Sequence, residues 1–168
     1  MKASSDLLKQ LISSSGLSGR EGPVSELIQE AWQPLVDDIH VSRVGSIQAL
    51  SRGNAPEPRP VVMLATHMDA IGLMVTAVVG EFLRITAIGG IDHRVLPGQL
   101  VTVHGREDLP GVVAQPPGDF IPAGGSDPIE MKYLLVDVGL EEDLLREKVR
   151  VGDLVSFAQP PMEMGKDV

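Results

Sequence analysis

The chain has 168 residues, of which 43% are hydrophobic and 22% charged, and its formal net charge is −9. This composition can form a folded core and argues against intrinsic disorder. The negative charge argues against a nucleic-acid or membrane-binding surface, because such a surface needs a basic patch. With no cysteine, disulfides and thiolate metal sites are excluded, so any metal would need histidine and carboxylate ligands.

Three further expectations follow from composition. Aromatic residues make up only 3% of the chain, so the core must consist of Val, Leu, Ile, Met and Ala. No apolar run is long enough to span a bilayer. The N-terminus lacks the uninterrupted apolar segment of a signal peptide, so a cytoplasmic location is expected.

The first fifty residues predict two helices and two short strands. A short opening helix is indicated by Leu7, Leu8, Leu11 and Ile12, and an amphipathic helix by the apolar positions from Val24 to Leu35. Ser18 and Glu21 have the spacing of a capping box at its start. Two strands are expected on either side of Gly45.

The segment from Val61 to Gly72 is the most informative part of the sequence. An apolar run at 61–65 predicts a strand buried on both faces, and it ends in His67-Met68-Asp69. Polar groups just past such a strand lie where open α/β sheets bind ligands, and residues two apart share a face. His67 could bind a metal, with Asp69 fixing its tautomer. The alternative is a strand-end histidine that is simply hydrogen-bonded to a carboxylate.

Beyond Asp69 the pattern becomes rich in short strands separated by Gly and Pro turn signals. Such runs lie at residues 71–79, 82–88, 100–104, 111–114, 133–138 and 154–158, with one helix at about 141–148. This spacing is typical of a small antiparallel barrel or sandwich. The fold class is therefore α/β up to about residue 70, with too few elements to complete a covered sheet, followed by a mostly β domain.

Three segments together resemble a known family. They are Gly16–Glu21, then Ala65-Thr66-His67-Met68-Asp69-Ala70-Ile71-Gly72, and then Ile88-Gly89-Gly90-Ile91-Asp92 continuing to Gly98. They resemble the dinuclear-metal aminopeptidases of the glutamyl-aminopeptidase, cellulase-M-like and tetrahedral-aminopeptidase group. The resemblance extends over nearly the whole chain.

The resemblance implies a domain organisation. Residues 1–70 would be the N-terminal part of a catalytic α/β domain, 71–160 an inserted β-barrel that mediates oligomerisation, and 161–168 a return segment. The expected partners are a peptide substrate and further copies of the chain, in a dimer or, at full length, up to a tetrahedral dodecamer.

The resemblance also implies roles for site residues. His67 would bind one of two divalent ions, zinc or cobalt, and Asp69 would be the catalytic residue that supports it. The family's other ligands and its general-base glutamate follow the inserted domain, and Asp167 lacks the expected context and is not assigned. Since each metal needs about four ligands, the 168-residue chain is expected to be inactive alone and to be part of a longer protein.

Two alternatives stay open at this stage. The chain could be a non-catalytic β-barrel assembly or binding module, whereas a cellulase-type activity ranks low because a dinuclear centre suits peptide hydrolysis better. The other polar candidates, Asp92, His93, His40 and His104, are expected in turns or on the surface and are not assigned as ligands.

Overall fold

The computed structural model describes residues 2–117, 129–162 and 164–165. The chain forms two compact units, one comprising Met1–Ala70 with Pro161–Val168 and the other Ile71–Pro160. In the described part of the chain, no helix combines the length and apolar character needed to cross a membrane.

The first unit begins with two helices, α1 (Lys2–Ser13) and α2 (Gly22–Trp32), followed by a 3-10 turn η1 (Gln33–Leu35). Pro23 lies in the first turn of α2, where its missing N–H costs no helical hydrogen bond. The predicted capping box does not form: the N-cap is Glu21, which makes no side-chain cap hydrogen bond. The reason is that Ser18 lies in a separate turn, where Arg20 N–H donates to Leu17 O at 2.8 Å.

A two-stranded hairpin follows, formed by β1 (Asp38–Val41) and β2 (Ile47–Leu50). The strands pair antiparallel, with Val41 opposite Ile47. Gly45 has a φ of 87° in the connecting turn, a conformation that glycine adopts without strain. The two strands predicted around this glycine are confirmed.

The predicted buried strand at residues 61–65 does not form. Residues 51–69 contain no helix or strand, and Val61, Val62, Met63 and Leu64 are 82–91% exposed. A buried strand needs hydrogen-bonding partners on both sides and a covering layer. The two strands of this unit pair only with each other, so the described residues offer this apolar run no sheet to join.

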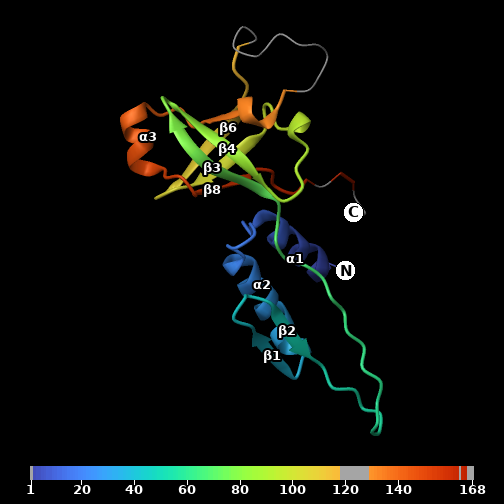
Figure 1. Cartoon of the computed structure of the whole chain (residues 1–168). Helices are drawn as coiled ribbons and strands as arrows, with labels where there is room; N and C mark the ends of the chain where they lie inside the picture. The colour runs from blue at the N-terminus through green and yellow to red at the C-terminus, as the bar shows by residue number, and fades with distance from the viewer. Residues whose placement is uncertain (1, 118–128, 163, 166–168) are drawn as a thin grey trace. The chain divides into compact units, whose positions relative to one another are not determined.

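The second unit is a closed β-barrel (Figure 1). It has six antiparallel strands in the order β3-β4-β7-β6-β5-β8. Its strands, in chain order, are β3 (Gly72–Val79), β4 (Phe82–Ile88), β5 (Leu100–His104), β6 (Asp108–Ala114), β7 (Leu135–Asp137) and β8 (Leu154–Phe157). Between the strands, the described residues form the 3-10 turns η2 (His93–Val95) and η4 (Met131–Tyr133) and the helix α3 (Glu142–Lys148). Closure leaves no unpaired sheet edge. The predicted fold class, helices and strands with a mostly antiparallel β-barrel, is confirmed.

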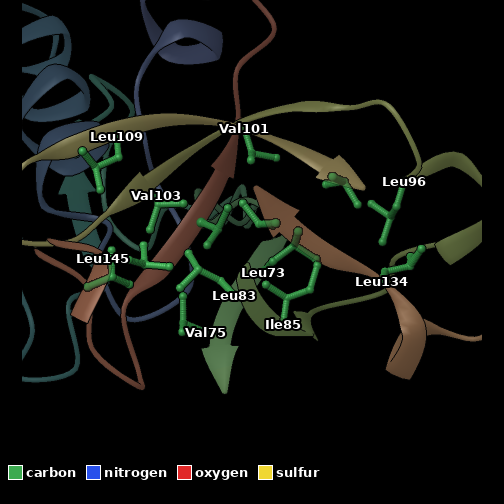
Figure 2. Packing of buried hydrophobic residues seen from close by; sticks show 14 residues of the cluster. Leu73, Val75, Leu83, Ile85, Leu96, Val101, Val103, Leu109, Leu134 and Leu145 are labelled. Atoms are coloured by element: carbon green, nitrogen blue, oxygen red, sulfur yellow. The ribbon is translucent and has the colours of Figure 1, made fainter. Parts of the chain in front are cut away.

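The barrel encloses an aliphatic core (Figure 2). Alternate residues of each strand point inward, as the two-residue period of a strand requires. Leu145 of α3 is fully buried in the same cluster. The fully or almost fully buried strand residues are Leu73, Val75, Leu83, Val101, Val103, Val113, Val136 and Val155.

Replacing a core residue of the barrel should destabilise it strongly. Leu83→Ala removes a side chain that is 0% exposed, and we expect the free energy of unfolding to fall by about 2–5 kcal/mol. Leu100→Ala is the matched control, because Leu100 is 60% exposed on the same barrel; its effect should stay below about 0.5 kcal/mol. Urea titration followed by methyl NMR signals of the barrel measures both. Equal effects of the two substitutions would contradict this assignment of the core.

Candidate functional site

The segment around His67 and Asp69 is held against the turn that precedes α2. Ala70 N–H donates to Gly16 O at 2.7 Å, and Leu17 and Ala70 form an isolated parallel bridge. A Cβ at position 16 would lie 2.6 Å from Val24 Cγ2, so a residue other than glycine would force the Val24 side chain to move. This pairing brings together two parts of the chain that are about fifty residues apart.

His67 and Asp69 lie within hydrogen-bonding distance of each other. The His67 Nδ1 atom is 3.1 Å from Asp69 Oδ1 and 3.1 Å from the Asp69 main-chain oxygen. Both neighbours are acceptors, so in the neutral ring Nδ1 carries the hydrogen and Nε2 keeps its lone pair. The His67 side chain is 85% exposed. This is the tautomer in which a histidine can bind a metal through Nε2.

Asp69 is bonded through both carboxylate oxygens. Oδ1 faces His67, and Oδ2 accepts a hydrogen bond from the Ser18 hydroxyl. The hydrogen bond from Ser18, followed by that from His67, lowers the pKa of Asp69 below its ordinary value. The side chain is therefore a carboxylate at neutral pH.

Ser18 is the residue of this cluster that the sequence reasoning missed. Its spacing to Glu21 suggested a helix cap, but the Glu21 carboxylate instead accepts a hydrogen bond from Gly19 N–H at 2.7 Å. Gly19 has a φ of 86°, so residues 17–20 form a turn of their own before the helix. No local pattern in one sequence links Ser18 to a carboxylate 51 positions further along.

The described residues do not by themselves provide a complete metal site. None of their His, Asp and Glu side chains form a group of three or more that could hold a metal ion. His67 offers one imidazole nitrogen, with Asp69 supporting the ring, whereas a zinc ion typically takes four ligands. Asp167 lies outside the described residues. The roles assigned to His67 and Asp69 therefore stay predictions.

Asp92 makes the side-chain contacts of a turn residue. Its carboxylate accepts from the Arg94 main-chain N–H at 3.0 Å and from Arg94 Nε at 2.8 Å, at the start of η2. These hydrogen bonds from the Arg94 side chain and main chain lower the pKa of Asp92 to about 2. This matches the turn interpretation and leaves Asp92 paired with an arginine.

His104 is bonded at both ring nitrogens on the barrel. Nδ1 lies 2.8 Å from Asp108 Oδ1 on β6, and Nε2 lies 2.8 Å from Ser156 Oγ on β8. The order Asp-His-Ser is that of a hydrolytic triad. Here, however, His104 and Asp108 are direct strand partners, and Ser156 lies opposite Thr102 on the adjacent strand. Cross-strand pairing accounts for the cluster.

Removing the Arg94 side chain should raise the pKa of Asp92. In Arg94→Ala we expect that pKa to move from about 2 toward its ordinary value of 3.8, because the largest cause of the shift is lost. The ion pair stabilises the fold above the ordinary pKa, and this contribution is lost as pH falls toward 2. Carbon-13 NMR of the Asp92 carboxyl in the folded protein measures the change.

Arg84→Ala is the control for this measurement, since the Arg84 side chain donates to Lys132 O instead. It should leave the Asp92 titration unchanged. Addition of Zn²⁺ should not shift the Asp92 signal in the unsubstituted protein. A zinc-induced shift would contradict the turn interpretation and point to Asp92 as a ligand.

Comparisons with known proteins agree with one another. The family model described as M42 glutamyl aminopeptidase matches residues 45–168. The lysyl aminopeptidase of Pyrococcus furiosus is 30% identical over an alignment of 162 residues that covers 91% of this chain and 45% of that protein. The crystal structure of the TET aminopeptidase of a marine-sediment Thaumarchaeota archaeon superposes with a TM-score of 0.87 at 28% identity, over 98% of this chain and 47% of that one.

A further solved structure is that of the TET1 peptidase of Pyrococcus horikoshii, described as able to assemble into a tetrahedron or a large octahedral shell. Its TM-score is 0.74 at 29% identity, over 90% of this chain and 46% of that one. The chain thus spans less than half the length of each of these three proteins.

Proposed function

Because the chain belongs to the M42 glutamyl aminopeptidase family, we propose that it forms part of a metal-dependent aminopeptidase that removes N-terminal residues from peptides. The observation that carries this proposal is the hydrogen-bonded pair of His67 and Asp69, with the ring exposed and Nε2 free of the pair. The pair lies inside the matched segment, residues 45–168. An exposed imidazole supported by a carboxylate suits a metal ligand.

His67 would hold one divalent ion, zinc or cobalt, through Nε2. Asp69 would keep the ring in the Nδ1–H tautomer, and its negative charge would make Nε2 a stronger donor. When bound, the metal ions would supply an acidified water and polarise the scissile carbonyl. The general base that takes a proton from that water would come from outside the described residues, as would the remaining ligands.

The proposal includes inactivity of this chain by itself. One ligand and one supporting carboxylate do not hold two ions, and the described residues contain no further group that could. Calorimetric titration of the 168-residue chain with Zn²⁺ or Co²⁺ should therefore detect weak binding at most. A tight two-site isotherm would contradict the proposed incompleteness.

A second candidate function is that of an assembly module. The observation that favours it is the barrel, which has its own aliphatic core and a closed sheet. The Pyrococcus horikoshii relative is described as forming large shells, and we propose that this chain also forms homo-oligomers. A cytoplasmic location stays a prediction.

An activity measurement separates the two candidates. We expect the 168-residue chain alone not to hydrolyse peptides with a free N-terminus. The chain combined with the polypeptide encoded immediately downstream of it should hydrolyse them in the presence of Zn²⁺ or Co²⁺, and a chelator should abolish the activity.

His67→Ala should lower that activity by more than about 100-fold. Losing a group that only supports a metal ligand costs about 10- to 100-fold, and losing the ligand itself should cost more. His40→Ala is the matched control, because His40 lies on β1 and belongs to the same unit. Hydrolysis that survives His67→Ala would refute the proposed role of this residue. Oligomers without any hydrolysis in the combined preparation would favour the assembly module.

A further inference from the structure

We propose that Ser18 is a positioning residue for the His67 ring. Its hydroxyl holds one oxygen of Asp69, so that the other oxygen stays at His67 Nδ1 and leaves Nε2 as the metal-binding atom. This inference rests on the proposed function, because it assumes that the Nε2 lone pair of His67 is used by a metal.

The side chains of Ser18, Asp69 and His67 form a hydrogen-bonded relay, in which each contacts the next. The Ser18 hydroxyl donates to Asp69 Oδ2, and Asp69 Oδ1 lies 3.1 Å from His67 Nδ1. The Asp69 side chain is 41% exposed, so packing alone leaves its carboxylate freedom to rotate. The hydrogen bond from Ser18 holds the carboxylate in the orientation that keeps one oxygen at the ring.

The turn before α2 leaves the Ser18 hydroxyl available to donate to Asp69. A serine three residues before a glutamate is a favoured N-cap, because its side chain can accept a hydrogen bond from the first turn of the helix. Here Glu21 is the N-cap, and its carboxylate accepts from Gly19 N–H. The Ser18 hydroxyl is therefore not used by the helix and can donate to Asp69.

The main-chain hydrogen bond between Ala70 and Gly16 keeps Ser18 close to Asp69. The hydrogen bond from Ala70 N–H to Gly16 O, 2.7 Å long, flanks the bond between Ser18 and Asp69. The main-chain hydrogen bond and the side-chain hydrogen bond together hold residues 66–70 against residues 16–20. The main-chain hydrogen bond does not involve the Ser18 side chain. Removal of the Ser18 hydroxyl should therefore free the Asp69 carboxylate while residues 16–20 and 66–70 stay paired.

The test is the tautomer of the His67 ring in the full 168-residue chain without metal. Long-range proton–nitrogen-15 NMR, under mildly alkaline conditions where imidazoles are neutral, reports which ring nitrogen carries the hydrogen. We expect mainly the Nδ1–H form in the unsubstituted protein. In Ser18→Ala the Nδ1–H population should fall, while the Asp69 main-chain oxygen, 3.1 Å from Nδ1, should keep it above that of an unrestrained imidazole.

Two variants control this experiment. Ser18→Thr keeps the hydroxyl and should restore the Nδ1–H form. Ser14→Ala removes another hydroxyl of the same unit, one that donates to Gln10 O at 2.9 Å, and should leave the ring unchanged. If Ser18→Ala does not fold, Ser18→Cys keeps the shape with a weaker donor and should show an intermediate population.

Metal binding supplies the second readout. Zn²⁺ titration followed at the His67 ring signals should give an apparent dissociation constant about tenfold weaker in Ser18→Ala, the lower end of the cost of losing a partner that orients a ligand. An unchanged tautomer and an unchanged zinc affinity in a folded Ser18→Ala protein would overturn the inference.

Failure of this inference is distinguishable from failure of the proposed function. If the tautomer follows Ser18 but the combined preparation hydrolyses peptides equally well after His67→Ala, the metal role of His67 fails, and the inference fails with it. If the combined preparation shows His67-dependent hydrolysis while Ser18→Ala leaves the tautomer unchanged, only the positioning role of Ser18 is lost.

Discussion

The candidate site depends on one long-range contact, the pairing of the turn at residues 16–20 with the segment at 66–70. Gly16 makes this contact possible, because a side chain there would collide with Val24. The Ala70 amide then bonds to the Gly16 carbonyl, and Ser18 meets Asp69. The hydrogen bond from Ser18 to the Asp69 carboxylate follows from this pairing, whereas the contact of His67 Nδ1 with the Asp69 main-chain oxygen is local. The segment around His67 has no regular secondary structure.

The two aspartates show how different partners lead to different chemistry. Both have a lowered pKa, but the cause at Asp92 is the positively charged Arg94, whereas the causes at Asp69 are hydrogen bonds from Ser18 and His67. A carboxylate paired with a guanidinium has its charge compensated. One that accepts from a hydroxyl and a neutral imidazole keeps its charge beside the ring, which strengthens the free nitrogen as a donor.

The two units differ in how completely they pair their strands and bury their apolar residues. The barrel pairs all of its strand edges and buries its aliphatic residues. The first unit leaves the apolar run Val61–Leu64 largely exposed, and burial of such a run is normally worth several kcal/mol. That surface agrees with the span of the chain, which is less than half the length of the relatives compared.

The sequence by itself determined the local elements: the helices, the hairpin around Gly45 and the strands of the barrel. Their alternation and turn signals act over a few residues, so they can be recognised without knowing the rest of the fold. It also placed His67 and Asp69 on one short segment. Only the tertiary structure decided that Val61–Leu64 stays exposed, that Ser18 bonds to Asp69 instead of capping α2, and that His104 joins Asp108 and Ser156. These outcomes depend on which distant backbone or side chain is available as a partner, and one sequence does not encode that in any local pattern.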